Sequence, residues 1–589
     1  MRELERTAVS VVAGTPAAHA DIDAFDASEK EDVDRKAGAV SPAPGREPWE
    51  DLFQLGPQGL SEERRAAALK AYEGYASTQR LHFLGYQADQ KLDYSADLTW
   101  MLDYHINNVG DPFTDGNFTL NSKVAERQVL DYYARLWHAK LPHDPKDPES
   151  YWGYALTMGS TEGNLYGMWN ARDYLSGKAL IARPQRGHRP PRLMWVQGKR
   201  SGVPDDAVHE DHSLTPVAFY SEDTHYSLTK AMRVLGIPTF FELGTKLYPK
   251  ECPLGGPWPE EVPSLAGPSG RSTDGPGQID VKALEGLVRF FANKGYPILL
   301  CLNYGTTFKG AYDPVEAVIA MLKTAIPKDL FEREIECEGH KEKRYGFWVH
   351  VDGALGAAYM PFLKMAQDEG TFDKTIPVPP FDFGLDYVFS IAMSGHKWIG
   401  APWPCGVFMT KVKYQLRPPS IPVYVGSPDT TFAGSRSGFS PLIFWDYLAK
   451  HSHADQKQMA CAAQEVASYA ELALLQLGQR LKLDLYVART PLALTVRFRK
   501  PVDALVHKYS LSTEEFENDP LKRQYAHIFL MPGITREKID ELVADLSKPG
   551  AFEPGPSLSP SKLETPVAAV EADDKHHLAL VPTSGRGFR

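Results

Sequence analysis

The stretch Ser394–Gly400, Ser-Gly-His-Lys-Trp-Ile-Gly, places one lysine directly after an apolar run. That run, residues 387–393, has the composition of a buried strand. A lysine at this position lies at the edge of a sheet, where open α/β folds bind their ligands. Partial desolvation by its neighbours favours the neutral, nucleophilic amine. Lys397 is therefore a candidate for covalent attachment of pyridoxal 5′-phosphate (PLP); the alternative is a surface lysine after a core strand.

A second apolar run, residues 347–351, ends on Asp352 and is followed by Gly353 and Ala354. PLP acts as an electron sink only while its pyridine nitrogen stays protonated, and a buried aspartate maintains that state. The two small residues leave room for a flat ring against the backbone. A helix N-cap is the alternative role for Asp352. Because Asp352 and Lys397 end strands of the same kind, the pair favours the cofactor site.

A turn of small residues, 158–164, precedes a predicted helix that includes residues 165–172. Backbone N–H groups and the helix dipole favour an anion at such a helix start. The hydroxyls of Ser160 and Thr161 add donors, so the turn is a candidate phosphate site. Taken alone, the same turn is usually just a capped helix.

Two further polar residues follow strand-like runs. His225 comes after residues 217–220, and its imidazole could stack on the exposed face of the cofactor ring. Thr307 comes after residues 298–302 and either lines the pocket or is an ordinary polar turn residue. A lone histidine is more often structural than catalytic, but the shared position after a strand favours a role at the same sheet edge.

Seven ordered motifs resemble those of the group II PLP-dependent amino-acid decarboxylases. Within that family the nearest branch holds the bacterial PLP-type histidine decarboxylases and the plant serine decarboxylases. The resemblance spans roughly residues 50–540, judged by motif order. The motifs are residues 107–113, 159–164, 221–227, 303–311, 350–354, 394–398 and 434–438.

This resemblance implies an α/β protein of PLP fold-type I, similar to aspartate aminotransferase. A large domain with a mostly parallel sheet would be joined to a smaller C-terminal α+β domain. The family builds its sites at a subunit interface, which implies a homodimer. The residues expected to bind PLP are Lys397, Asp352, Ala354, His225, Ser160, Thr161, Thr307, Ser394 and His396.

The implied reaction removes the α-carboxylate of an L-amino acid and yields a primary amine and CO₂. Histidine is the favoured substrate, with serine, aromatic and acidic amino acids left open. The chain has Gly353 where the family often has alanine, Pro314 in place of a second aspartate, and Ser437-Gly438-Phe439 in place of Asn-Gly-His. The last difference bears on the substrate, because that segment lies near the family's site entrance.

Two other classes of function remain open. One is a different PLP reaction on the same fold: oxidative deamination coupled to decarboxylation, aldol cleavage or transamination. The other is a non-catalytic scaffold, which intact Lys397, Asp352 and His225 disfavour.

Tyr424 is the candidate proton donor to the substrate Cα, because related decarboxylases carry a tyrosine on a mobile loop in this region. The segment around it, residues 422–428, contains two prolines and a glycine and reads as a loop. The alternative is a loop aromatic packed at a subunit interface. As the donor, Tyr424 would sit on a loop that closes over the substrate and excludes water.

Bulk composition restricts the function. A chain of 589 residues exceeds one ordinary domain, and a net charge of −11 disfavours nucleic acid or an anionic membrane as a partner. Five cysteines without a Cys-x-x-Cys pair indicate a reducing compartment, hence the cytoplasm, and no structural metal. No apolar run approaches the length of a membrane helix.

Composition shifts along the chain predict its organisation. The N-terminal residues read as a disordered tail rather than a signal peptide. Strand-like runs, among them residues 193–196, alternate with helical patterns through the middle of the chain, which predicts βαβ units. The expected parts are a tail (1–48), a helical arm (49–120), a large PLP domain (121–410) with a surface insertion (253–277), a small domain (411–548) and a second disordered tail (549–589).

Overall fold

The computed structural model describes residues 49–553 apart from 186–190, 203–211, 416, 419–420, 517–518 and 520–521. The predicted N-terminal tail and residues 554–589 of the C-terminal tail lie outside the described residues. The chain divides into two compact units, residues 1–81 and 82–589. In the first, η1 (Glu50–Phe53) precedes α2 (Glu62–His82), and the ring of Trp49 packs edge-on against Phe53 and Tyr72.

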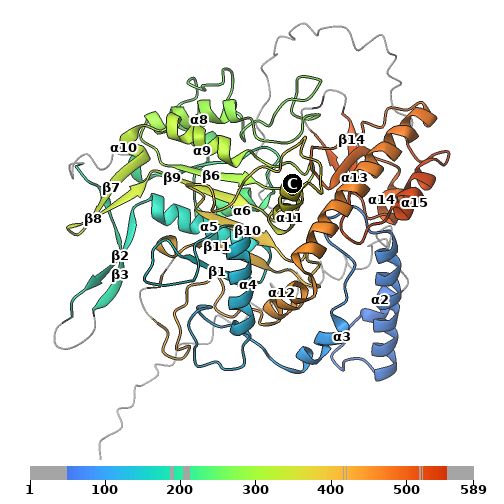
Figure 1. Cartoon of the computed structure of the whole chain (residues 1–589), viewed down its shortest axis with the longest axis horizontal. Coiled ribbons are helices and arrows are strands. Elements are labelled where there is room, and N and C mark those ends of the chain that lie inside the picture. The colour runs from blue at the N-terminus through green and yellow to red at the C-terminus, as the bar shows by residue number, and fades with distance from the viewer. Residues whose placement is uncertain are drawn as a thin grey trace, which may run out of the picture. The chain divides into compact units, whose positions relative to one another are not determined.

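A six-stranded mixed sheet forms the centre of the second unit (Figure 1). Three successive pairs, β10–β9, β9–β6 and β6–β5, are parallel, while β11 runs antiparallel to both β10 and β1. All residues of β1, β6, β9 and β10 are buried, as expected for strands covered on both faces. In order across the sheet, the strands are β1 (Tyr151–Leu156), β11 (Gly406–Lys411), β10 (Ser390–Ser394), β9 (Phe347–Asp352), β6 (Ile298–Asn303) and β5 (Val217–Phe219).

Helices cover this sheet on both faces. Figure 1 shows α8 and α9 on one side and α5 on the other. The helices of the second unit are α3 (Ser95–Leu98), α4 (Lys123–Leu136), α5 (Ser160–Leu175), α6 (Ser227–Leu235), α7 (Phe240–Leu247), α8 (Val281–Asn293), α9 (Val315–Ala325), α10 (Lys328–Phe331), α11 (Gly356–Glu369), α12 (Phe439–Lys450), α13 (His453–Leu481), α14 (Asp503–Lys508) and α15 (Arg536–Leu546).

The predicted strands mostly coincide with the strands of the sheet, with two corrections. The last parallel strand begins at Ser390 rather than Tyr387, because Tyr387 has a left-handed backbone with φ 67°. The run at residues 193–196 is a strand, β3 (Arg192–Gln197), but among the described strands it pairs with β2 (Lys178–Arg183) alone, in a separate hairpin. Its residues are exposed or half-buried, unlike those of the central strands. The antiparallel strands β1 and β11 were not predicted.

The smaller C-terminal part has its own sheet and core. Strands β12 (Thr495–Arg499), β14 (Gln524–Phe529) and β13 (Ser512–Glu515) form an antiparallel sheet in that order. A second hydrophobic cluster contains residues from β12, β14, α13 and α15. The packed C-terminal part extends beyond residue 549, where the disordered tail was predicted to begin. Ala551 is buried, and its carbonyl accepts a hydrogen bond from the Val502 N–H over 2.9 Å.

A buried ion pair and the hydrogen bonds around it connect two of the sequence motifs. The guanidinium of Arg436 pairs with the carboxylate of Glu126 on α4, and both side chains are fully buried. Glu126 also accepts hydrogen bonds from the Asn108 amide and from the Ala155 N–H, each over 2.8 Å. The Asn108 N–H in turn donates to the Arg436 carbonyl over 3.0 Å. Motifs 107–113 and 434–438 are therefore held together beside β1.

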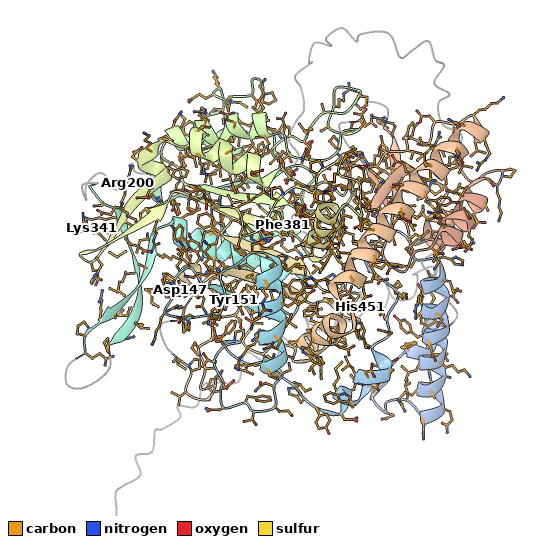
Figure 2. All side chains as sticks on the ribbon, viewed as in Figure 1. Asp147, Tyr151, Arg200, Lys341, Phe381 and His451 are labelled. Atoms are coloured by element: carbon orange, nitrogen blue, oxygen red, sulfur yellow. The ribbon has the colours of Figure 1, made fainter. Side chains whose placement is uncertain are left out.

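Shorter elements lie at the periphery. A three-stranded sheet of β4 (Lys199–Arg200), β7 (Glu332–Cys337) and β8 (His340–Tyr345) carries exposed ion pairs, including Lys341 with Glu334 over 2.7 Å (Figure 2). The predicted surface insertion has no helix or strand, but it is not wholly on the surface, because Trp258 and Val262 are buried. All five cysteines are free thiols.

Candidate active site

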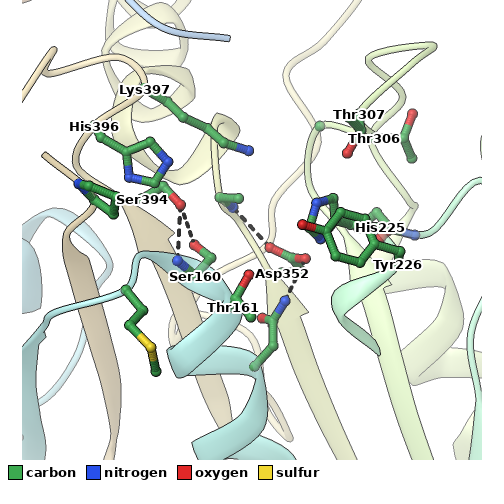
Figure 3. Close-up of a pocket in the computed structure, with 16 residues that line it drawn as sticks. Ser160, Thr161, His225, Tyr226, Thr306, Thr307, Asp352, Ser394, His396 and Lys397 are labelled. Carbon is green, nitrogen blue, oxygen red and sulfur yellow. Dashed lines mark hydrogen bonds between the residues drawn. The ribbon is translucent and has the colours of Figure 1, made fainter. Parts of the chain in front are cut away.

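The polar residues predicted from the sequence gather in one cavity of about 230 Å³ (Figure 3). It lies at the carboxyl ends of β5, β6, β9 and β10 and at the start of α5, the position where open α/β sheets bind ligands. Nine of the ten candidate residues line it. These are Ser160, Thr161, His225, Thr307, Asp352, Ala354, Ser394, His396 and Lys397.

Lys397 follows β10 and lies in the wall of this cavity. Desolvation lowers the pKa of its amine to about 8, and the charge of Asp352 only partly offsets this effect. The amine donates a hydrogen bond to Gln87 Oε1 over 2.6 Å. Gln87 is buried, and its Nε2 has no hydrogen-bond partner among the described residues. A lysine with this pKa is substantially neutral near pH 8 and thus a competent nucleophile.

Asp352 is the last residue of β9 and is buried. One carboxylate oxygen, Oδ2, accepts a hydrogen bond from Asn164 Nδ2 over 2.8 Å. The other, Oδ1, accepts from the Ala354 N–H over 3.2 Å. These two donors fix the plane of the carboxylate within the cavity.

The start of α5 forms a second wall. Gly159 has a φ of 69°, and a Cβ there would lie 2.5 Å from His396 Cε1, so only glycine fits between the turn and that ring. The Ser160 N–H donates to Ser394 Oγ over 3.0 Å, and the Ser394 hydroxyl donates to Ser160 Oγ over 2.9 Å. Burial, and then the charge of Lys397, lower the pKa of His396. Hydroxyls, a helix N-terminus and an imidazole thus face the same volume.

His225 lies across the cavity from Ser160, just before α6, with Thr306 and Thr307 nearby (Figure 3). Its Nδ1 is 2.8 Å from Ser227 Oγ and accepts a hydrogen bond from the Ser227 N–H over 3.2 Å. Burial is the largest influence on its pKa, which is lowered, so the ring is neutral at neutral pH. The Thr306 hydroxyl accepts a hydrogen bond from the Ala311 N–H, which shapes the turn that carries Thr307.

Tyr424 is not brought to this cavity. Its side chain is 85% exposed, and it does not line the pocket of its own chain. Val423, beside it, is 90% exposed. The amide of Asn117 donates to the carbonyls of both residues, over 3.2 and 3.3 Å. The predicted proton donor therefore lies on an exposed apolar tip in this conformation.

Sequence reasoning missed two residues that line the cavity, Asn303 and Asn164, and one that contacts Lys397, Gln87. Asn303, the last residue of β6, could have been found by the same strand-end rule that identified Asp352. Asn164 lies within motif 159–164, but no function was predicted for it. Gln87 lies far away in sequence, 310 residues from Lys397, on an irregular segment before α3 with no local signal.

The residues present fit PLP. An amine for covalent attachment, a buried carboxylate for the pyridine nitrogen, and hydroxyls at a helix start for a phosphate all face one cavity. Because residue 159 is glycine, the His396 ring can lie close to the start of α5.

Comparison with known proteins agrees with this geometry. Residues 272–434 match the model of the pyridoxal-dependent decarboxylase conserved domain. Histidine decarboxylase of Solanum lycopersicum is 30% identical over 479 residues, covering 81% of this chain and 87% of that protein. The chain belongs to the pyridoxal-dependent decarboxylase family. Serine decarboxylase 1 of Oryza sativa subsp. japonica is 27% identical over 83% of this chain and 77% of that relative.

Among solved structures, the L-methionine decarboxylase of Streptomyces sp. 590 is 50% identical to this pyridoxal-dependent decarboxylase, with a TM-score of 0.78. The alignment covers 86% of this chain and 99% of that one. The predicted fold-type I architecture, the PLP cofactor and the carboxy-lyase activity are thereby confirmed. No helix in the described parts of the chain combines the length and apolar character needed to cross a membrane.

Proposed function

We propose that this decarboxylase acts on L-methionine and releases 3-(methylthio)propylamine and CO₂. The observation that carries the proposal is the 50% identity to an L-methionine decarboxylase, across nearly the whole of that chain. The sequence-based preference for histidine rested on the branch resemblance, and the tomato histidine decarboxylase is 30% identical.

The charge of the cavity supports an uncharged substrate side chain. Its acidic, basic and imidazole lining residues are His225, Asp352, His396 and Lys397 within the described part of this chain. Each of them is proposed to serve the cofactor, which leaves no further cation for an acidic side chain and no further carboxylate for a basic one. Met158 and Tyr226 add apolar surface to the lining.

The proposed roles follow from the positions of the side chains. PLP supplies an electron sink for the electron pair left on Cα when CO₂ departs. Lys397 would attach the cofactor, and Asp352 would keep its ring nitrogen protonated. Ser160, Thr161, Ser394 and His396 would hold the phosphate.

The neighbouring residues would orient the ring. Neutral His225 would stack on one face, while Ala354 and Thr307, which line the cavity, would border the ring. Holding the Cα–carboxylate bond perpendicular to the ring stabilises the transition state more than the ground state.

Tyr424 remains the proposed proton donor to Cα, and a homodimer remains the proposed assembly. An exposed apolar tip carrying Ile421, Val423 and Tyr424 suits insertion at the site of a second copy. We retain a cytoplasmic location as a prediction, in keeping with five free thiols.

The test compares kcat/KM for L-methionine, L-histidine, L-serine and L-norleucine, with amine and CO₂ both measured. Methionine should exceed histidine and serine by at least about tenfold. Norleucine replaces the thioether sulfur with a methylene, so it should fall within about tenfold of methionine. A preference for histidine or serine would refute methionine as the proposed substrate. Formation of peroxide and ammonia in place of the amine would refute the proposed reaction.

A further inference from the structure

Behind the cavity, a chain of buried polar side chains runs from β9 and β10 through α5 to Asp352. Trp348, His350 and Ser390 are fully buried, and Asn164 is 1% exposed. Burying a polar group costs free energy unless it is hydrogen-bonded, so the hydrogen bonds among these side chains stabilise their positions.

In this series of buried side chains, the donor and the acceptor of each hydrogen bond can be assigned. Asn164 Nδ2 donates to Asp352 Oδ2 over 2.8 Å and to Ser227 Oγ over 3.1 Å, which uses both of its hydrogens. Asn164 Oδ1, 2.9 Å from His350 Nε2, must therefore accept, and His350 carries its proton on Nε2.

The hydrogen bonds at the other end of the series, around Ser390, agree with a proton on His350 Nε2. His350 Nδ1 lies 2.8 Å from Ser390 Oγ and accepts a hydrogen bond from its hydroxyl group. Ser390 Oγ in turn accepts a hydrogen bond from Trp348 Nε1 over 3.2 Å. Each polar atom in the series from Trp348 to Asp352 thus has a partner of the right kind, and the amide of Asn164 has one permitted orientation.

Close packing of α5 on the sheet makes the contact between Asn164 and His350 feasible. A Cβ at Gly167 would lie 2.8 Å from His350 Nδ1, so the helix can approach β9 this closely only with glycine there. Asn164 lies one helical turn earlier, on the same side of α5 as Gly167.

We propose that Asn164 is a positioning residue that orients the Asp352 carboxylate toward the cofactor ring, with its amide held in the required orientation by His350. A second branch runs through Ser227, whose Oγ is also 2.8 Å from His225 Nδ1. Because His225 Nδ1 accepts from the Ser227 N–H, the proton of the neutral ring sits on Nε2. One amide thus connects the carboxylate and the imidazole that are proposed to contact the cofactor.

This role of Asn164 rests on the proposed contact between Asp352 and the pyridine nitrogen. The test distinguishes a failure of the Asn164 role from a failure of that contact. The probes are PLP and its 1-deaza analogue, in which a C–H replaces the ring nitrogen and removes that contact. Dissociation constants of both are measured by absorbance on the full-length chain freed of cofactor. The wild-type chain should bind PLP more tightly than the analogue.

Asn164→Ala should weaken PLP binding by about tenfold, since a hydrogen bond to a charged group is lost, and should change binding of the analogue by less than about twofold. The matched control is Asn170→Ala. Asn170 lies on the same helix, is 2% exposed, and its side chain makes no hydrogen bond within the described residues. That control should leave both constants unchanged.

His350→Leu is the second variant, because it leaves Asn164 in place and removes its anchor. It should weaken PLP binding in the same selective way, and its effect should not add to that of Asn164→Ala. Equal losses for both ligands, no loss of PLP affinity, or full additivity would overturn the proposal. Equal wild-type affinity for PLP and the analogue would overturn it too, and would place the failure in the role of Asp352.

Discussion

The amine of Lys397 is hydrogen-bonded to the side-chain oxygen of Gln87, a residue 310 positions earlier in the chain, over 2.6 Å. The pairing places an uncharged acceptor, rather than a carboxylate, next to the nucleophile. An amide accepts from the ammonium without the strong stabilisation of charge that an aspartate would give, so desolvation dominates and the pKa falls to about 8.

Covalent capture of PLP by the cofactor-free chain should therefore follow an unusual pH profile. The rate should rise up to about pH 8 and then level off, rather than climbing toward the ordinary lysine value of 10.5. Stopped-flow absorbance measures the rate, and reductive trapping with peptide mapping identifies the lysine. Gln87→Leu should shift the midpoint to lower pH, because the ammonium form loses a hydrogen bond. A midpoint near 10 in the wild-type chain would contradict this assignment.

Tyr424 should act on the active site of a second copy. Tyr424→Phe alone should cut amine formation by about 10²–10⁴-fold, the usual cost of losing a general acid. Lys397→Ala alone should be inactive. Mixed dimers of the two variants contain one site with an intact lysine and, from the other subunit, an intact tyrosine, so random mixing should restore about a quarter of wild-type activity. No recovery in verified mixed dimers would place the tyrosine in its own chain or remove it from the reaction.

Acid should destabilise the fold partly through His350. Burial lowers the pKa of this imidazole from 6.5 to about 4, so between these values the unfolded chain binds more protons than the folded one. The free energy of unfolding should then fall with decreasing pH in that window, by up to about 1.4 kcal/mol per pH unit for this group.

His350→Gln should make that pH dependence shallower, as measured by chemical denaturation at a series of pH values. His527→Gln is the matched control, since burial lowers the pKa of His527 to about 4 as well. Both variants should flatten the profile, but His350→Gln alone should weaken PLP binding. An unchanged slope in His350→Gln would show that the imidazole is already protonated in the fold.

The buried pair of Arg436 and Glu126 should be sensitive to loss of one partner. Arg436→Met leaves the Glu126 carboxylate buried without its counter-charge and should cost about 3–5 kcal/mol of unfolding free energy. Arg436→Met with Glu126→Leu should recover much of that loss. Lys364→Ala, which removes an exposed pair with Asp368 on α11, should cost under about 1 kcal/mol. Comparable losses for the buried and exposed pairs would contradict this interpretation.

The sequence was most informative where a side chain follows a buried strand. Asp352, Lys397 and Asn303 share one sheet edge because their parallel strands end there, and that geometry follows from the chain's alternation of strands and helices. Two of the three were predicted on this basis, and Asn303 could have been.

Other features depend on tertiary contacts that leave no local pattern. Gln87 meets Lys397 only because two distant segments pack together. The hydrophobic run at residues 193–196 could not be distinguished from a central strand by periodicity. Tyr424 lies on an exposed loop, and its proposed place at the site of a second copy would depend on contacts between chains, which leave no local pattern in the sequence.

The cavity lining divides into residues fixed by the hydrogen-bond ladder of the sheet, such as Asp352 and Ser394, and residues on irregular segments, such as Met158 and Pro404. Replacing a residue of the second kind disturbs no strand pairing. A substitution at such a position can therefore reshape the cavity while the side chains held by the sheet keep their places. One scaffold can in this way accommodate decarboxylases named for histidine, serine and methionine, as the relatives of this chain are.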